Sequence, residues 1–479
     1  MLLGTKFNTL ADNTVDYWMK PNSNLSYSDI DEKMATLRWS EKSTLQLYVH
    51  IPFCTQKCSF CAFSGGNSLE FNEVERYVAN LKKHLDFVLD KTKVKEREID
   101  SIHIGGGSPD ILGGNARSLL DYLTSLPGFT ERTELSIEIS LFSVRNEFIT
   151  QLSRYPITKI SFGVQSLNPR IRQYLKMPAK LRKLDEICAR LRKTIPVINV
   201  DLMTGFPTQT LDDVFYDLEY FINHPHVNSI STYLFSKGSA PAFIADVISG
   251  KIPTSPTDIY HANLRFHSYL TLQSYGWKRF GTNTYLDTSD IDPDILSIIK
   301  GNECLGAHSY DDFLIGVGAS AVSYFPGLRI ENKSSLTEWM ADIKSGILPY
   351  DLKKCSIEKQ KDMALWGLPL NFRGIHKDEL KKLINNGILD NNQVATFEDY
   401  IRQGLIKLNA DDVYNLTVLG EVFQGKMVKE LKKKKDQQVL TNYIDEGHEL
   451  ALLVSEGRIM DINTLNNRQK GIRDKLTKI

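Results

Sequence analysis

The chain has 479 residues, 42% of them hydrophobic, with Lys+Arg and Asp+Glu both at 58. This length allows two or three domains with their own cores, and the balanced charge gives no support to a nucleic-acid or anionic-membrane partner. The N-terminus lacks a secretory pattern, and no apolar run approaches the roughly 20 residues of a membrane helix. Six cysteines in a chain of this size fit a reducing compartment. We therefore expect a cytoplasmic protein with no membrane partner.

Residues 1–44 are polar and irregular, with Tyr17, Trp18 and Trp39 among Asn, Ser and Asp. Isolated tryptophans in such a segment usually pack back onto the body of a protein. We interpret this stretch as an N-terminal arm, and one hypothesis is that it covers an active site.

A cysteine loop follows the first predicted strand. Leu47, Val49 and Ile51 alternate as in a buried strand, and Pro52 should end it. Three cysteines then come in the pattern C-x3-C-x2-C: Cys54, Cys58 and Cys61. Thiolates this close on one loop favour a soft metal or an iron–sulfur cluster.

Three ligands are one fewer than a closed metal site needs. A [4Fe–4S] cluster on three cysteines would keep one iron open for an exogenous ligand. The alternative is a zinc site whose fourth ligand is His50 or a remote residue, such as Cys188, Cys304 or Cys355.

The string YVHIPFC, with Phe60 just before the third cysteine, resembles the radical S-adenosylmethionine (SAM) superfamily. Within it, the sequence is similar to the oxygen-independent coproporphyrinogen III oxidase-like (HemN-like) branch. The resemblance implies a [4Fe–4S] cluster whose open iron is chelated by SAM. It also implies reductive cleavage of SAM to a 5′-deoxyadenosyl radical, with an electron donor such as flavodoxin or ferredoxin. Tyr48 and Phe60 match contacts to the cofactor.

A run of glycines follows the next predicted helix and strand. Apolar residues at helical spacing predict a helix over 70–91, and IDSIHI predicts a short strand ended by Gly105-Gly106-Gly107. Three glycines let backbone approach a ligand without obstruction, although a tight turn is an equal alternative. With Ser108 and Pro109 after it, the run resembles the family's GGGTP element. That resemblance implies SAM contacts at Gly106, Gly107 and Ser108.

Further strands are predicted at 135–140, 157–167, 196–207 and 230–235, with helical stretches between them. Alternating β and α units favour an α/β fold with a parallel sheet and helices outside. Six units resemble the partial (β/α)6 TIM-type barrel of radical SAM enzymes, in which ligands bind at the C-terminal ends of the strands.

Polar residues occur within or at the ends of three of these strands: Glu138, Gln165 and Asp201. Each could cap a local turn, but buried polar groups on successive strands favour a shared ligand. The resemblance assigns Glu138 to the cluster-bound SAM, and it assigns Gln165 and Asp201 to a second SAM molecule.

One position departs from the family pattern. Twelve residues after Gln165 the family usually carries an arginine, and this chain has Met177. A thioether cannot replace a guanidinium. Either Lys176 or Arg182 supplies the charge, or the second ligand sits differently.

The segment DFLIGVGASAVSYF resembles the family's IGxGxSAxS element near the adenosine site, which implies a contact at Val322. Phe235, the last residue of the sixth predicted strand, is a further candidate cofactor contact. Cys304 and His308 are candidates for touching the substrate.

The C-terminal part is rich in Lys and Glu at helical spacing and resembles the family's helical C-terminal domain. Lys432–Lys435 read most simply as a solvated helix face, with a winged-helix nucleic-acid binder as the alternative. We predict an arm (1–44), a radical SAM core (45–290), a segment packing on the barrel (291–345) and a helical domain (346–479).

Three activities fit this branch. The true oxidase carries another cysteine where this chain has Phe63, and the heme chaperone typically has Asp where it has Ala62. We therefore expect transfer of a methyl or methylene carbon from a second SAM to an sp2 carbon, as in the class C radical SAM methyltransferases. The alternatives are oxidative decarboxylation of coproporphyrinogen III and heme binding by a chaperone. The substrate would be a small molecule, such as a tetrapyrrole or an unsaturated metabolite.

Overall fold

The computed structural model describes residues 25–40, 43–61, 71–178, 181, 183–235, 241–253, 258–281, 283–299, 312–357 and 374–431. Most of the predicted arm lies outside these residues, as do Lys180, Arg182, Cys304, His308 and Lys432–Lys435.

The architecture is built on one large sheet. Within the described residues it has 12 strands in the order β12-β11-β10-β9-β1-β2-β3-β4-β5-β6-β8-β7. Strands β1 to β6 are mutually parallel and adjacent in chain order, which confirms the predicted α/β fold with six βα units. Their bounds are β1 (Leu45–Ile51), β2 (Ser101–Gly106), β3 (Glu134–Ile139), β4 (Lys159–Gln165), β5 (Val197–Thr204) and β6 (Ser229–Leu234).

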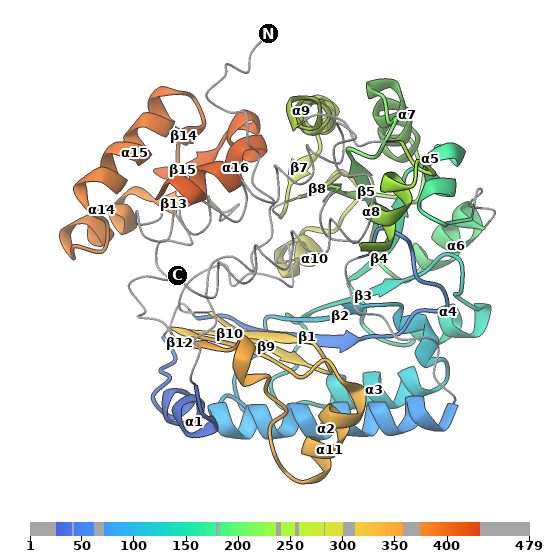
Figure 1. Cartoon of the computed structure of the whole chain (residues 1–479), viewed down its shortest axis with the longest axis vertical. Helices are drawn as coiled ribbons and strands as arrows, with labels where there is room; N and C mark the ends of the chain where they lie inside the picture. Colours follow the sequence, from blue (N-terminus) through green and yellow to red (C-terminus); the bar gives the residue numbers. More distant parts are fainter. Residues whose placement is uncertain are drawn as a thin grey trace.

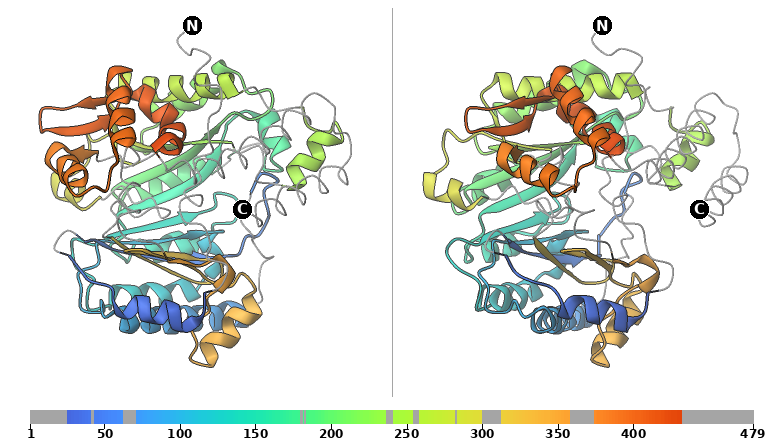
Figure 2. Two further views of the ribbon diagram at one scale, coloured as in Figure 1. Left: turned by 60° about the vertical axis from the view of Figure 1, so that its left-hand side comes forward. Right: turned by 90° about the vertical axis from the view of Figure 1, so that its left-hand side faces the viewer.

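Helices cover the outer face of this curved sheet (Figures 1 and 2). The expected helix at 70–91 is α2 (Phe71–Thr92), whose apolar positions are buried. The other described helices up to residue 357 are α1 (Tyr27–Ala35), α3 (Asn115–Thr124), α4 (Asn146–Leu152), α5 (Pro169–Tyr174), α6 (Leu184–Leu191), α7 (Leu211–Ile222), α8 (Pro241–Ile248), α9 (Asp258–Ser274), α10 (Pro293–Ile298) and α11 (Leu336–Lys344), with the short 3-10 helices η3 (Pro109–Leu112) and η4 (Leu352–Lys354).

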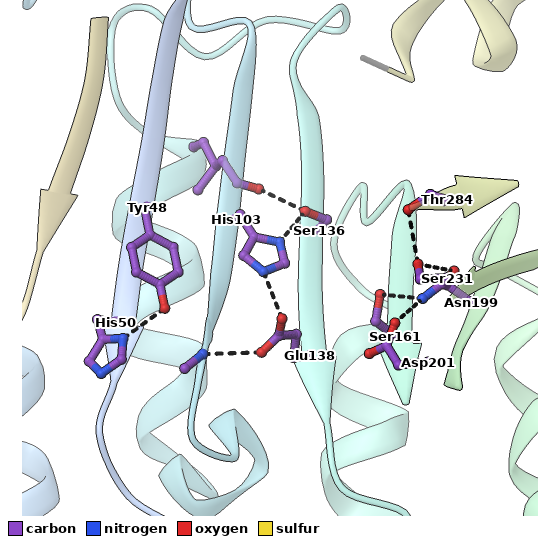
Figure 3. A network of polar contacts seen from close by, with 12 residues as sticks. Tyr48, His50, His103, Ser136, Glu138, Ser161, Asn199, Asp201, Ser231 and Thr284 are labelled. Atoms are coloured by element: carbon purple, nitrogen blue, oxygen red, sulfur yellow. Dashed lines mark hydrogen bonds and ion pairs between the residues drawn. The ribbon is translucent and has the colours of Figure 1, made fainter. Parts of the chain in front are cut away.

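The parallel strands have apolar side chains on one face and polar side chains on the other. Side chains alternate between the two faces of a strand. On β2 and β3, Ile102, Ile104, Leu135 and Ile137 belong to the main apolar core, whereas their neighbours His103, Ser136 and Glu138 form a polar network (Figure 3). The side of the strands that carries this network is therefore suited to hold a polar ligand.

The sheet continues beyond β1 through residues far away in sequence. Strand β9 (Phe313–Val317) pairs in parallel with β1, so Tyr48 lies opposite Gly316. Antiparallel pairings then extend the sheet, and the far edge beyond β6 is also antiparallel. The strands concerned are β7 (Lys278–Arg279), β8 (Thr284–Leu286), β10 (Val322–Phe325), β11 (Leu328–Glu331) and β12 (Ser356–Ile357).

A second unit near the C-terminus combines helices with a small sheet. The expectation was a helical domain, and the structure adds a three-stranded sheet in the order β13-β15-β14. Its elements are β13 (Ile375–His376), α14 (Lys377–Asn385), α15 (Asn391–Arg402), β14 (Ile406–Leu408), β15 (Val413–Leu416) and α16 (Val418–Leu431). Glu421 of α16 is buried and joins this unit to the large sheet through Arg279 at 3.0 Å and the Tyr285 hydroxyl at 2.7 Å.

In the part of the chain that the structure describes, no helix combines the length and apolar character needed to span a membrane.

Candidate active site

The cysteine loop leaves the C-terminal end of β1 and is fastened to the end of α5. Ser59 N donates to Leu175 O at 3.1 Å, and Ser59 Oγ donates to Tyr174 O at 2.8 Å. Gln56 Nε2 donates to Lys176 O at 2.9 Å. The helix that follows β4 therefore holds the loop backbone, and this fixes where the thiols of the loop lie.

Cys54, Cys58 and Cys61 are outside any disulfide and are of intermediate exposure. Burial, with the neighbouring thiols, raises the pKa of Cys54 and of Cys58 to about 11. A metal that binds these thiols would therefore have to displace their protons.

Three thiols on one loop are a donor set that iron–sulfur clusters use. In a four-iron cluster each thiolate binds a different iron, so the sulfurs need not meet at one point. The donor set of three thiols on one loop therefore fits a [4Fe–4S] group.

The glycine run lies against this loop. Gly107 N donates to Ile51 O at 2.7 Å, and Ser108 N donates to Phe53 O at 2.7 Å. A Cβ on Gly107 would lie 2.3 Å from Phe53 O. Gly106 has a φ of +106°, and a Cβ there would meet the His50 ring at 2.4 Å. The glycines thus permit a backbone approach that no other residue type would allow.

Glu138 is held at the centre of the polar network in Figure 3. One carboxylate oxygen lies 3.2 Å from His103 Nε2, and the other accepts from Gly106 N at 3.1 Å. His103 Nδ1 in turn lies 2.7 Å from Ser136 Oγ. Burial raises the pKa of Glu138, but His103, Gly106 N–H and His50 outweigh it, so the net shift is downward. The carboxylate therefore stays ionised and can bind a cationic or hydroxyl-bearing ligand.

Tyr48 and His50 project from the same strand beside this carboxylate. The Tyr48 hydroxyl lies 2.7 Å from His50 Nδ1 (Figure 3). Burial lowers the pKa of His50 to about 4, although the charge of Glu138 opposes the shift. The imidazole is accordingly neutral near pH 7, which leaves Glu138 without a cationic neighbour on β1.

Asp201 belongs to a second polar group on β4, β5 and β6. Its carboxylate accepts from Asn199 Nδ2 at 2.8 Å, and Asn199 is held by Ser161, Ser229 and Ser231 (Figure 3). Burial and the charge of Glu138 raise the pKa of Asp201 to about 7. Asp201 can therefore hold or release a proton near neutral pH.

Gln165 ends β4 in a strained conformation. Its φ is +69°, and the register between β4 and β5 shifts there. A Cβ on Gly163 would lie 2.8 Å from Gln165 Nε2, so the glycine leaves room for this side chain. Gln165 Oε1 is buried without a hydrogen-bond partner in the described part of the chain. Such an orphaned acceptor is what a ligand donor would satisfy.

The remaining predicted contacts fall into two places. Phe60 and Phe235 flank Phe206, with ring centroids 6.2 Å and 5.0 Å from it, in an apolar cluster beside the cysteine loop. Val322 begins β10 on the other side of β1, and its carbonyl oxygen would lie 2.2 Å from a Cβ on Gly316. The glycine at 316 therefore allows β9 and β10 to pack closely.

Position 177 carries no charge in the structure. Met177 is buried in that apolar cluster, and the Lys176 ammonium pairs with Asp246 at 3.2 Å. Lys176 therefore does not stand in for the arginine expected at 177, and Arg182 lies outside the described residues.

Sequence reasoning missed several partners that complete the site. His103, Ser136, Asn199 and Ser231 alternate with buried apolar residues along their strands, so period-two patterning could have placed them on the inner face. Their pairing with Glu138 and Asp201 depends on strand register, which no local pattern specifies.

Comparison with known proteins gave three findings. Residues 48–221 match the family model described as Radical SAM superfamily. The heme chaperone HemW of Buchnera aphidicola subsp. Schizaphis graminum is 24% identical over 396 residues, which is 80% of this chain and 97% of the relative. The oxygen-independent coproporphyrinogen III oxidase of Helicobacter pylori is 32% identical over 185 residues, which is 37% of this chain and 39% of the relative.

A solved structure agrees with the fold. Coproporphyrinogen III oxidase (HemN) from Escherichia coli superposes with a TM-score of 0.69 at 17% identity, over 88% of this chain and 95% of that chain. The family match runs from β1 to α7, so it includes the cysteine loop, Glu138, Gln165 and Asp201.

Proposed function

We propose that the chain is a radical S-adenosylmethionine protein of the HemN-like branch, which cleaves SAM reductively and acts on a tetrapyrrole; the match of residues 48–221 to the superfamily model and the similarity to HemW and HemN support this. Members of this superfamily use a [4Fe–4S] cluster and SAM. The observation that carries the proposal is the placement of three cysteines on one loop beside a glycine run and an ionised carboxylate at the C-terminal ends of parallel strands.

In this proposal Cys54, Cys58 and Cys61 would be the protein ligands of the cluster, and SAM would bind next to them. The cluster, when bound, supplies the electron that cleaves the sulfonium. Gly106, Gly107 and Ser108 present backbone to SAM, because the close packing of this run on β1 leaves no side chain in the way.

Glu138 binds the same SAM molecule as an anion preorganised by His103 and Gly106 N–H. Tyr48, Phe60, Phe235 and Val322 line its apolar and aromatic surroundings. Because a fixed acceptor needs no reorganisation when the ligand arrives, Glu138 should contribute strongly to SAM affinity.

Gln165 and Asp201 form a second polar position, for another SAM or for the substrate. The orphaned Gln165 Oε1 and the protonatable Asp201 support a ligand here. We expect Asp201 to donate a hydrogen bond when protonated and to accept one when ionised, so occupancy of this position should depend on pH.

The comparisons favour tetrapyrrole chemistry over carbon transfer. The relatives are named as heme chaperones and coproporphyrinogen III oxidases, whereas the methyl transfer expected from the sequence has no counterpart among them. We therefore propose oxidative decarboxylation of a porphyrinogen propionate as the reaction: the deoxyadenosyl radical takes one hydrogen atom from the propionate, carbon dioxide leaves, and the one remaining electron passes to an external one-electron acceptor, so that a vinyl group forms. Heme carriage is the second candidate, because the chaperone relative matches over 97% of its own length.

The electron would come from a small reductant protein such as flavodoxin or ferredoxin. We propose a cytoplasmic location, because six cysteines in a chain of 479 residues fit a reducing compartment.

The test is anaerobic reconstitution with iron, sulfide, SAM and dithionite, with coproporphyrinogen III added, followed by mass spectrometry. The proposal predicts 5′-deoxyadenosine together with a porphyrinogen that has lost carboxylates. The Cys61→Ala variant should yield neither product and serves as the blank.

Two other results would redirect the assignment. Deoxyadenosine with S-adenosylhomocysteine would indicate carbon transfer. A heme Soret band on mixing, with no deoxyadenosine, would indicate a chaperone.

A further inference from the structure

A buried arginine lies behind the cysteine loop. Arg172 of α5 is 0% exposed. Its Nη1 donates to Val164 O at 2.8 Å and to Ser166 O at 2.9 Å, and its Nε donates to Pro178 O at 2.6 Å. Nη2 is buried and has no hydrogen-bond partner among the described residues. A guanidinium buried in this way is costly unless negative charge compensates it.

The neighbouring protein groups compensate that charge only in part. The Asp217 carboxylate favours the charged form of Arg172. However, burial raises the pKa of Asp217 to about 7, so it is partly protonated at neutral pH, and its Oδ1 already accepts from Leu167 N at 2.9 Å. The Phe142 ring adds a cation–π contact at 5.4 Å. These groups therefore leave part of the guanidinium charge uncompensated, and a further negative group nearby would stabilise it.

The cysteine loop supplies a place for that charge. Cys58 packs against the same apolar cluster as Ile171 and Leu175. Ile171 directly precedes Arg172 in α5, and Leu175 is the C-cap of that helix. The next loop residue, Ser59, donates its N–H to Leu175 O at 3.1 Å and its hydroxyl to Tyr174 O at 2.8 Å, so the loop is fastened to the end of the helix that carries Arg172. Because the surroundings are apolar, the attraction between the guanidinium and a negative group bound at the loop would be screened less than it would be at a surface.

Arg172 also shapes the neighbouring strand end. The two carbonyl groups that share Nη1 belong to Val164 and Ser166, which flank Gln165 and its left-handed φ of +69°. One guanidinium thus clamps both sides of a strained residue. The same side chain joins the cysteine loop region to the second polar position.

We propose that Arg172 is the fixed positive charge of the cluster site and the positioning residue of the Gln165 turn. Three thiolates give the bound cluster a negative charge, and reduction adds another electron to it. A buried cation close to one ligand stabilises the reduced form and makes the cluster easier to reduce. The inference rests on the cluster site of the proposed function.

The test is a redox titration of the reconstituted cluster in full-length protein without SAM. Electron paramagnetic resonance of the reduced cluster gives its midpoint potential. Arg172→Met should move the potential to a more negative value. We expect at least a tenfold fall in the reduced-to-oxidised ratio at a fixed poise, which is about 59 mV for one electron. Arg172→Lys, which keeps the charge, should stay close to the wild type.

Arg170→Met is the matched control. Arg170 lies in the same helix but is exposed, so losing its charge should leave the potential unchanged because solvent screens it. A role of Arg172 in folding alone would reduce cluster content in the Met variant but leave the potential of the remaining cluster at the wild-type value.

An unchanged potential in Arg172→Met with normal iron content would overturn the inference. If the Met variant does not fold, Arg172→Gln takes its place, because its amide can still donate to the carbonyls but carries no charge. Equal potentials in the Gln and Lys variants would also overturn it. A wild-type protein that takes up no iron would overturn the proposed function, and the inference with it.

Discussion

Replacing Gly107 with alanine should displace the cysteine loop. The new Cβ would lie 2.3 Å from Phe53 O and 2.7 Å from Ile51 O, and both of these are backbone atoms that no rotamer change can move. Restoring an ordinary contact of at least 3.4 Å requires a shift of about 1 Å. The shift would weaken the bonds from Gly107 N to Ile51 O and from Ser108 N to Phe53 O.

The expected cost combines two effects. Overpacking of this kind costs roughly 1–3 kcal/mol, and two weakened backbone hydrogen bonds add about 1 kcal/mol each at most. We therefore expect Gly107→Ala to lower the free energy of unfolding by roughly 1–5 kcal/mol. Because a displacement of about 1 Å at a reacting centre can cost about 100-fold in rate, SAM cleavage should fall at least that much.

The assay is urea unfolding of the metal-free protein, paired with iron content and 5′-deoxyadenosine formation after reconstitution. Gly114→Ala is the matched control: it lies at the start of α3 with a φ of −63°, and a Cβ there would meet nothing within 4 Å. The reasoning is refuted if Gly107→Ala unfolds at the same urea concentration as Gly114→Ala and binds a full cluster.

Three further changes test the inner face and the C-terminal unit. Burial and Glu138 raise the pKa of Asp201 to about 7, so the folded protein binds more protons than the unfolded chain between about pH 4 and 7, and stability falls as pH rises through that range. Asp201→Asn should flatten this fall when urea unfolding is repeated across pH. Glu138→Gln should raise the SAM dissociation constant about 10- to 100-fold in equilibrium dialysis, because it loses a charged acceptor. Glu421→Ala should break the buried contacts to Arg279 and Tyr285, which costs about 3–5 kcal/mol and should speed hydrogen exchange in residues 374–431.

Each of these predictions has a clear contrary outcome. An unaltered pH slope in Asp201→Asn would show that this carboxyl titrates normally. Wild-type SAM affinity in Glu138→Gln would remove the carboxylate from the cofactor site. For the C-terminal unit, Asp412→Ala is the control, because its pair with Lys377 is exposed and should contribute little; exchange rates equal to those of Glu421→Ala would contradict the docking role.

The strands of the core could be predicted from the sequence because each combines a period-two pattern with a clear terminator. The stretch at 45–51 ends at Pro52, and β2 ends in the glycine run. The pairing of β9 with β1 could not be predicted, because it joins residues some 270 positions apart with no local signal. Strands β13, β14 and β15 were missed because they span only two to four residues.

The residues of the candidate site also divide into those that the sequence predicts and those that it does not. The motif residues Cys54, Cys58, Cys61 and Glu138 stand out in the sequence because their spacing or their polarity within an apolar strand is unusual. Arg172 does not stand out, because an arginine in a short helix is normally exposed. Only the packing of α5 between β4 and the cysteine loop turns it into a buried cation.

The most direct test of the account is the metal content of protein purified without oxygen, together with its dependence on single cysteines. We predict about four irons and four sulfides per chain, and their loss in Cys54→Ala, Cys58→Ala and Cys61→Ala. Cys188→Ala, which changes a buried thiol of α6, should retain them. Stoichiometric zinc without sulfide, or iron that survives all three loop substitutions, would contradict the cluster site and the function built on it.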